Sequence, residues 1–198
     1  VGTFGVTRND NGQIITKTET VNGTTNNFVY DYDTVGRLTD VWKNGALVEH
    51  YEYTNGIRDL ETSTLRSVVN RSLTYNAEDQ VLTTGSITYA HDVDGFLTTK
   101  TDGSDVTTYD YSSRGELLQV DLPSGTVITY DHDPLGRRIT KRVNGTVTEK
   151  YLWNGLTQLL AVYDGSDVLQ MRFEYADALV PFAMVKNGTR YYLSYDQV

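Results

Sequence analysis

The stretch Tyr30-Asp31-Tyr32-Asp33-Thr34-Val35-Gly36-Arg37-Leu38 decides the fold, because the chain returns to this pattern several times. An aromatic-acidic-aromatic step is followed by a few polar residues, a glycine and an aliphatic residue. The residues that align in this stretch and its stronger and weaker copies are Tyr30, Asp31, Tyr32, Gly36, Tyr51, Tyr53, Gly56, Tyr89, Gly95, Tyr109, Tyr111, Gly115, Tyr130, Asp131, Gly136, Tyr151 and Gly155. The aligned glycines recur about every twenty residues, with Asp79 near the one missing position, and such a period indicates a repeat architecture.

A second turn signal lies about nine residues after the first in most repeats. Asn-Gly and Asp-Gly pairs suit tight hairpins, because glycine and asparagine tolerate the positive φ that these turns require. The pairs that predict such hairpin turns are Asn22-Gly23, Asn44-Gly45, Asp102-Gly103, Ser124-Gly125, Asn144-Gly145, Asp164-Gly165 and Asn187-Gly188. Each repeat is therefore expected to be one β-hairpin.

The segments between the turns are rich in Thr, Val, Ile, Leu and Tyr, which favour pleated strands. The sequence thus predicts an all-β chain, an antiparallel meander of about sixteen to eighteen strands in about nine hairpin repeats. Residues 1–198 are expected to form a single segment. The stretch from Leu60 to Ser72 is the least regular; a short helix could lie there, but its Thr and Ser content favours strands.

The tyrosines are expected to cover one face of the sheet. The chain has 15 tyrosines, and the repeat register predicts a same-face ladder of Tyr30, Tyr51, Tyr109, Tyr130 and Tyr151, each ring stacked on the next with its hydroxyl in water. About eighteen strands at roughly 4.8 Å would make a broad strip that twist should bend. We therefore expect a strongly curved or spiral single sheet.

Composition limits the partners. The net charge of −9 argues against nucleic acid, and the basic residues near Arg137 and Arg138 point to opposite faces of a strand. The chain has no cysteine, and we expect its N-terminal residues not to be a signal peptide and the chain to contain no membrane span. Both ends look cut, and the last phrase, Tyr191 to Val198, stops before a glycine, so we expect a segment excised from a longer chain.

The repeated phrase resembles the YD repeat of the Rhs (rearrangement hotspot) proteins, a superfamily that includes toxin-complex C components and the animal teneurins. The resemblance extends from about Asn9 to Val198, and Tyr151-Leu152-Trp153-Asn154-Gly155 is similar to a segment found late in bacterial Rhs repeat regions. The resemblance implies a β-strip that winds into a hollow shell and encloses a C-terminal toxin or effector. It also implies a secreted or cell-surface protein of the bacterial envelope, whose partners are the remainder of its own chain and the enclosed toxin.

The sequence offers no convincing active site, and we expect no enzyme, cofactor or metal site. Asp31 with Asp33, and Asp131 with Asp133, have the spacing of a glycosidase carboxylate pair. These acids recur at the head of most repeats, however, where they suit hydrogen bonds from turn amides. Asp133-Pro134-Leu135-Gly136 is similar to a cleavage phrase of the Rhs family, but within a repeat it reads as a turn.

The histidines are also interpreted structurally. His91 and His132 stand at the second aromatic position of the phrase, so they are read as substitutes for tyrosine. An alternative function is carbohydrate binding or adhesion, with Trp42 and Trp153 stacking on sugar rings, and neutral glycans suit the acidic chain better than heparin. Open edge strands further predict self-association.

Overall fold

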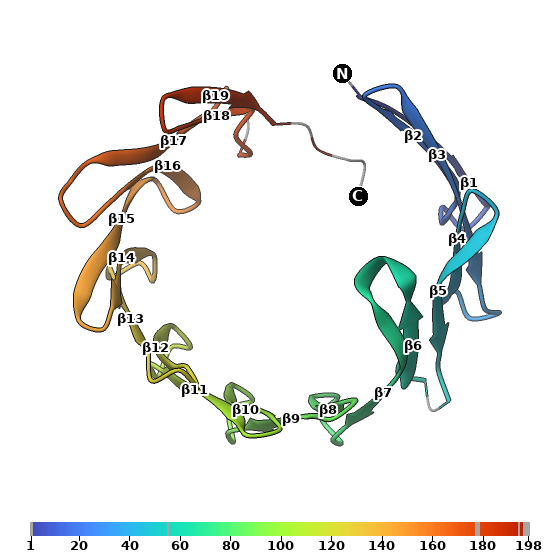
Figure 1. Cartoon of the computed structure of the whole chain (residues 1–198), viewed down its shortest axis with the longest axis horizontal. Coiled ribbons are helices and arrows are strands. Elements are labelled where there is room, and N and C mark those ends of the chain that lie inside the picture. Colours follow the sequence, from blue (N-terminus) through green and yellow to red (C-terminus); the bar gives the residue numbers. More distant parts are fainter. Residues whose placement is uncertain (1, 55, 177–178, 194, 196–198) are drawn as a thin grey trace. The chain divides into compact units, whose positions relative to one another are not determined.

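The computed structural model describes residues 2–54, 56–176, 179–193 and 195. Parts of two predicted phrases lie outside these residues: Asn55 of the copy that begins at Tyr51, and Ser194 and Asp196 to Val198 of the last phrase. The chain divides into two compact units, residues 1–88 and 89–198, and each unit is described by itself (Figure 1).

The first unit is an antiparallel meander in which each strand pairs with its neighbours in the chain. Its strands are β1 (Gly2–Arg8), β2 (Ile14–Val21), β3 (Thr24–Tyr32), β4 (Leu38–Lys43), β5 (Ala46–Glu52), β6 (Leu60–Ser63), β7 (Val68–Tyr75) and β8 (Val81–Thr84). A short 3-10 helix, η1 (Thr64–Arg66), lies between β6 and β7. The strand β9 (Ile87–His91) begins in this unit and pairs with β8.

The second unit continues the same topology. Its strands are β10 (Leu97–Asp102), β11 (Asp105–Tyr111), β12 (Leu117–Asp121), β13 (Val127–His132), β14 (Arg138–Val143), β15 (Thr146–Asn154), β16 (Gln158–Tyr163), β17 (Leu169–Glu174), β18 (Ala183–Lys186) and β19 (Thr189–Tyr192). The predicted all-β antiparallel meander is confirmed, with nineteen strands in the described residues against the sixteen to eighteen expected. The irregular stretch from Leu60 to Ser72 holds two strands and the single 3-10 turn.

Hairpin turns of the predicted type occur at the four Asn-Gly pairs, where both residues have positive φ. The other three pairs are turns of different kinds. Asp102 is the last strand residue and pairs with Asp105, so the turn begins at Gly103, and Gly103 but not Asp102 has a positive φ. Ser124-Gly125 and Asp164-Gly165 belong to longer corners, and in the second of these Asp167, not the glycine, has the positive φ of 66°. Turn position was therefore predicted correctly at these three pairs, but turn type was not.

The corner that follows the aromatic phrase is a compact loop held by its first residue. In the corner at Asp33, the amide of Asp33 donates to the carbonyl of Arg37 at 2.9 Å, and the amide of Gly36 donates to the carbonyl of Asp33 at 3.0 Å. The Asp33 carboxylate also accepts the amides of Val35 and Arg37. The same backbone pattern begins at Asn9, Asn76, Asp92, Ser112, Leu122, Asp133 and Asp164.

The fourth corner position requires a left-handed conformation, which explains the repeated glycine. Gly36 and Gly136 have φ of 89° and 78° there. Asp79 takes the same position with φ of 61°, so the copy that lacks a glycine still forms the corner. Aspartate is one of the few residues that tolerate this region, because its side chain bonds locally.

A β-bulge accompanies the second aromatic residue of the phrase. Asp31 lies opposite Asp40, whereas Tyr32 lies opposite Leu38, so one extra residue is inserted in β4. Register shifts fall at the equivalent steps before Tyr75, Tyr111, His132 and Trp153. Because bulges bend and twist a strand pair, a bulge repeated in this way curves the sheet. The strands β10 to β19 of the second unit follow an arc in Figure 1, in agreement with this expectation.

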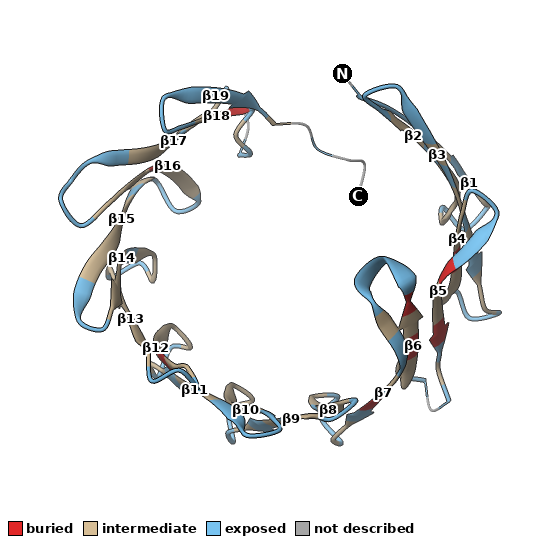
Figure 2. Ribbon diagram, in the orientation of Figure 1, coloured by how far each residue is buried: buried red, intermediate tan, exposed pale blue. Residues whose placement is uncertain are grey.

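The two faces of the sheet differ in packing. In β3, Phe28, Tyr30 and Tyr32 are half-buried, whereas Val29 and Asp31 between them are exposed. We call the face that carries Phe28, Tyr30 and Tyr32 the tyrosine face, and the face that carries Val29 and Asp31 the aspartate face. Fully buried positions are few and scattered along the strands, as Figure 2 shows, and include Val41 and Val120, which lie opposite Tyr30 and Tyr109.

The expected ladder of stacked tyrosines is wrong in one respect. The ring stacks found among the described residues join Phe28 to Tyr30 and Phe96 to Tyr111, not the first tyrosines of successive repeats. Those tyrosines lie two strands apart, about 10 Å, because each repeat contributes a hairpin. The intervening strand presents a smaller side chain such as Val41, which packs against Tyr30 from the neighbouring strand.

Candidate functional site

At four positions the second aromatic residue of the phrase joins its repeat to the one before it. The Tyr32 hydroxyl donates to the carbonyl of Ile14 at 2.8 Å, and the Tyr53 hydroxyl donates to the carbonyl of Leu38 at 2.8 Å. The indole nitrogen of Trp153 donates to the carbonyl of Arg138 at 2.8 Å, and Tyr175 donates to the carbonyl of Leu159 at 3.0 Å. We call this contact the aromatic clamp.

The acceptor of each clamp is the first or second residue of the strand that follows the preceding corner. Ile14 and Leu38 stand two residues after Gly12 and Gly36. The hydroxyls of Tyr32, Tyr53 and Tyr175 are thus hydrogen-bonded within the fold. Burial raises the pKa of Tyr32 and of Tyr53, as it should for phenols held against a sheet.

The residue after the corner glycine makes a further contact with the next corner. Gln13 donates from its side-chain amide to the carbonyl of Gly36 at 2.8 Å, and Arg137 donates to the carbonyl of Gly155. A Cβ atom added to Gly115 would lie 2.8 Å from the ring of Phe96. Gly115 therefore serves both the left-handed turn and the close approach of the preceding repeat.

Two parts of the chain follow the same plan with an offset of 100 residues. Residues 27–53 and 127–153 share the residues Tyr30, Asp31, Asp33, Gly36, Arg37, Asn44, Gly45, Glu49 and Tyr51 with their counterparts 100 positions later. Their contacts also correspond: Arg37 and Arg137 each donate to the corner aspartate at 2.7 Å.

The acidic residues of the phrase have internal partners. Asp33 and Asp133 accept corner amides and pair with arginines, and the hydrogen bond from the Arg37 amide, above all, lowers the pKa of Asp33. Asp31, on the aspartate face, accepts the indole N–H of Trp42 at 2.8 Å, whereas Asp131 accepts from Thr140 and Arg142. The expected hydrogen bonds from turn amides are thus confirmed for the corner acids but not for Asp31 and Asp131.

A buried carboxylate occupies the irregular hairpin of the first unit. Glu61 in β6 has no exposed surface, and it lies between Tyr51 and Arg71 on the neighbouring strands. Arg71 donates its Nε to Glu61 at 2.7 Å, and Arg66 and Arg58 approach within 3.4 and 3.6 Å. Burial alone would raise the pKa of Glu61, but the Arg71 hydrogen bond and the three positive charges lower it.

This buried charge stabilises a hairpin that has no Asn-Gly turn. The fully buried Ser63 donates to Glu49 at 2.8 Å and accepts the amide of Arg66 in η1. Glu49 also accepts the hydroxyl of Tyr51 at 2.8 Å. Burial, followed by this hydrogen bond, raises the pKa of Tyr51 to about 12. The cluster explains how η1 is held against β5 and β7.

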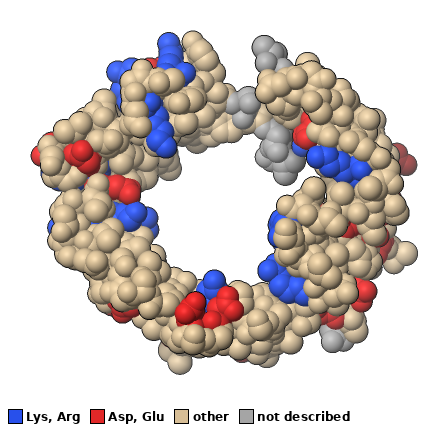
Figure 3. All heavy atoms as spheres, viewed as in Figure 1, with Lys and Arg blue, Asp and Glu red and all other residues tan. Residues whose placement is uncertain are grey.

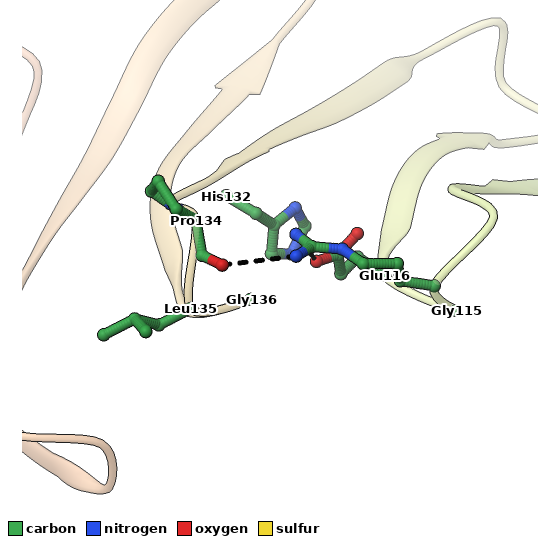
Figure 4. A pocket seen from close by; sticks show the side chains of 7 residues that line it. Gly115, Glu116, His132, Pro134, Leu135 and Gly136 are labelled. Atoms are coloured by element: carbon green, nitrogen blue, oxygen red, sulfur yellow. Dashed lines mark hydrogen bonds and ion pairs between the residues drawn. The ribbon is translucent and has the colours of Figure 1, made fainter.

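His91 and His132 occupy the second aromatic position, where an imidazole cannot reach as far as a phenol. The Nδ1 atom of each is buried and has no hydrogen-bond partner among the described residues. A hollow of about 470 Å³ lies beside His132, between the corners at Ser112 and Asp133 (Figure 4). Arg114 also lines this hollow and donates to the carbonyl of Pro134 at 3.2 Å.

A second hollow, of about 530 Å³, lies on the other side of the same corner. It is lined by His132, Leu135, Gly136, Arg137, Arg138, Tyr151, Trp153, Leu156 and Leu159. His132 and Arg138 lie directly opposite each other across β13 and β14. The Nε atom of Arg138 is also buried without a hydrogen-bond partner in the described part of the chain.

The two tryptophans proposed for sugar stacking lie in different settings. Trp42 is half-buried on the aspartate face and bonded to Asp31, and Trp153 is half-buried in the clamp position above Arg138. Both rings are held in fixed orientations by their indole N–H groups. Their role in binding remains a prediction.

The remaining surface is mixed in charge. Lys141 pairs with Glu149 at 2.9 Å, and Arg142 pairs with Asp131, so the basic stretch after Arg137 is distributed over several partners. Figure 3 shows acidic and basic side chains lying close to one another. Within the described residues there is no group of His, Asp and Glu suited to a metal ion. No helix described there has the length and apolar character needed to span a bilayer.

Sequence reasoning missed the clamp acceptors, the Glu61 cluster and the pairing of His132 with Arg138. The pairing of corner aspartate and arginine had a signal, because Arg follows the glycine in both Asp33 and Asp133 copies. The offset of 100 residues was also visible in the sequence. The Glu61 cluster had no periodic signal, since it occurs once.

The whole chain, residues 1–198, matches the family described as Teneurin YD-shell. Teneurin-3 of Mus musculus is 28% identical over 198 residues, covering 94% of this chain and 7% of that protein, and Teneurin-3 of Danio rerio is 29% identical with the same coverage. A protein of Dickeya dadantii named probable deoxyribonuclease RhsA is 44% identical over 48 residues, which is 24% of this chain and 3% of that protein.

Among solved structures, the crystal structure of TcdB2-TccC3-TEV covers 97% of this chain with 11% identity and a TM-score of 0.45, and the match takes in 14% of that chain. The crystal structure of TcdB2-TccC3 covers 98% of this chain with 13% identity and a TM-score of 0.42, and takes in 11% of that chain. The chain thus spans a small part of the length of each of these proteins.

Proposed function

The chain belongs to the YD-shell family, and from this premise we propose that it is wall in a β-shell that encloses a C-terminal toxin or effector. The enclosing protein would be large and secreted or exposed at the bacterial cell surface. A shell segment is a structural element, and we propose that this segment has no enzymatic role.

The aromatic clamp supports this proposal most strongly. Tyr32, Tyr53, Trp153 and Tyr175 each bond to the preceding repeat, so the same local contact fixes four of the hairpins to their neighbours. In repeat proteins, stability is close to a sum of repeat and nearest-neighbour terms, so the structure can extend without a new core. A wall built in this way can grow in area one repeat at a time.

The state of the acidic residues supports the non-enzymatic part of the proposal. Asp33 and Asp133 are held by corner amides, and Asp31 and Asp131 by cross-strand partners. A catalytic carboxylate pair needs one acid that is free to transfer a proton. Asp33 and Asp133 make the same contacts in the two copies of the scaffold, and Asp31 and Asp131 each bond to a cross-strand partner.

Enclosure can be tested on the natural full-length protein that contains this segment. We expect the polypeptide that follows the repeats to resist trypsin while the wall is folded, and to be cut rapidly once urea unfolds the wall. A control with the same downstream polypeptide expressed alone should be cut at once. Equal rates of cleavage in the full-length and isolated forms would contradict enclosure.

A second candidate function is neutral-glycan binding at the tryptophans. The observation that favours it is that Trp42 and Trp153 are partly exposed and oriented by their N–H groups, as a stacking platform requires. Calorimetric titration with neutral oligosaccharides should show saturable binding that Trp153→Ala or Trp42→Ala removes. Heat signals that are equal in the parent and both variants would exclude this function.

A further inference from the structure

The hollow beside His132 and Arg138 has the features of a binding site for an anion. His132 and Arg138 form a directly opposed pair across β13 and β14, and both line the space of about 530 Å³. The volume lies within the range of small ligand sites, about 300–1,000 Å³. Trp153 and Tyr151 add aromatic surface to the same hollow.

The pair has buried nitrogen atoms that the fold leaves without partners. The Nδ1 atom of His132 and the Nε atom of Arg138 are buried and accept or donate no hydrogen bond within the described residues. Buried polar groups are nearly always hydrogen-bonded, so two such atoms on one cross-strand pair call for an explanation. The side chains that carry these atoms are half-exposed, so a ligand in the hollow would contact the accessible part of each.

The neighbouring carboxylates do not supply this partner. Glu116 pairs with Ser112 and Arg114, Glu149 pairs with Lys141 and Tyr151, and Asp133 pairs with Arg137. The guanidinium of Arg138 lies 3.8 Å from the ring centre of Tyr130, and no described carboxylate is within ion-pair distance of it. Its charge is therefore available to a ligand.

The first copy of the scaffold shows that the fold does not require this pair. At the positions equivalent to His132 and Arg138 stand Tyr32 and Leu38, also directly opposed. Tyr32 closes its clamp on Ile14 at 2.8 Å, and its hydroxyl has a partner. The second copy replaces an apolar, satisfied pair by two nitrogen-bearing side chains that are unsatisfied.

We propose that this hollow binds the carboxylate of an acidic residue in an extended peptide segment whose neighbouring residues are apolar. Arg138 and His132 would hold the carboxylate through charge-assisted hydrogen bonds. The rim favours a peptide over an acidic sugar, because Leu135 and Leu156 are 61% and 67% exposed and offer apolar contact, not hydroxyl partners. The inference does not rest on enclosure of a toxin, since a peptide added from solution can occupy the site.

The test uses the fluorescence of Trp153. The chain has 2 tryptophans, so Trp42→Phe leaves Trp153 as the only reporter, and Trp42 lies in the other unit. Acetyl-Leu-Glu-Leu-amide is titrated into this variant, with acetyl-Leu-Gln-Leu-amide and glucuronate as comparison ligands. We expect saturable quenching or a spectral shift with the glutamate peptide, and affinity at least about tenfold weaker for the glutamine peptide.

Two variants test the site, and each introduces the residue that the first copy of the scaffold has at the equivalent position, Leu38 or Tyr32. Arg138→Leu and His132→Tyr should each weaken the glutamate peptide by about tenfold or more, while Arg172→Leu, which removes a guanidinium paired with Glu174, should leave its affinity unchanged. Circular dichroism and thermal unfolding confirm that each variant is folded. Affinity unaffected by both variants, equal binding of the glutamine peptide, or binding of glucuronate in place of the peptide would overturn the inference.

Discussion

The corner at Gly115 offers the sharpest test of why the repeats need glycine. Gly115 has φ of 83°, and a Cβ atom added there would lie 2.8 and 2.9 Å from two atoms of the Phe96 ring. Phe96 is stacked on Tyr111 with ring centres 5.1 Å apart, so its ring has little room to move away. Gly125 has a similar φ of 80°, but nothing lies within 4 Å of its added Cβ.

The two glycines therefore separate the cost of the backbone conformation from the cost of the contact. An alanine in the left-handed region costs about 1–2 kcal/mol, which applies to both positions. Forcing extra atoms into a packed contact adds about 1–3 kcal/mol, which applies only at Gly115. We expect Gly125→Ala to lower the free energy of unfolding by about 1–2 kcal/mol and Gly115→Ala to lower it by about 2–5 kcal/mol.

Urea denaturation followed by circular dichroism measures both variants against the parent chain. The midpoint should fall more for Gly115→Ala than for Gly125→Ala, with similar slopes if the unfolded states are alike. Adding Phe96→Leu should reduce the difference, because the smaller side chain leaves space for the new methyl group. Equal losses at the two glycines would refute the claim that close approach between repeats constrains the corner.

Three further predictions concern single contacts. Glu61→Gln should lower the free energy of unfolding by about 2 kcal/mol in urea denaturation, because the neutral amide loses the charge-assisted hydrogen bonds from arginines that are themselves partly exposed; a loss below that of an exposed control such as Glu52→Gln would contradict this. Gly165→Ala should destabilise although its φ is not positive, since the added Cβ would lie 2.1 Å from the carbonyl oxygen of Val147, and a thermal midpoint equal to that of the parent would exclude such a contact. Burial holds the Tyr51 phenol neutral, so its contribution to the free energy of unfolding should be fully present below about pH 10 and should be lost as the pH rises through the folded pKa of about 12. Tyr51→Phe should therefore flatten the fall of the urea midpoint at alkaline pH. A profile of midpoint against pH that is unchanged in this variant would contradict the assignment.

The turns and the strand order were predictable because their signals are local. Asn44-Gly45 encodes both residues of a two-residue turn, and the Asp33 to Gly36 spacing encodes the corner. The same local signal was misleading at Asp164-Gly165, which was predicted to be a tight hairpin turn with a positive φ at the glycine. Its neighbour Asp164 is a corner residue that accepts amides, so the left-handed position moved to Asp167.

The contacts between repeats could not be predicted in the same way. Whether the hydroxyl of Tyr32 meets water or the carbonyl of Ile14 depends on the bulge that shifts the register beside Tyr32. A bulge follows from backbone geometry across two strands, not from residue spacing in one. Stacking between successive tyrosines was predicted from the repeat period alone, which ignores the strand that lies between them.

The candidate binding hollow depends on two residues that are ordinary in sequence. His132 was interpreted as a tyrosine substitute, which describes its position but not the open space that a shorter ring leaves. Arg138 was treated as part of a scattered basic stretch. Only the register of β13 and β14 shows that the two lie opposite each other.

The aromatic clamp is the central claim, and removing single hydroxyl groups tests it most directly. Tyr32→Phe, Tyr53→Phe and Tyr175→Phe each delete one hydrogen bond to a preceding repeat, whereas Tyr192→Phe removes a hydroxyl from a ring that is 74% exposed. Urea denaturation should show losses of about 1 kcal/mol for each of the first three and little change for the fourth. Four indistinguishable unfolding curves would contradict the claim that these hydroxyls hold the repeats together.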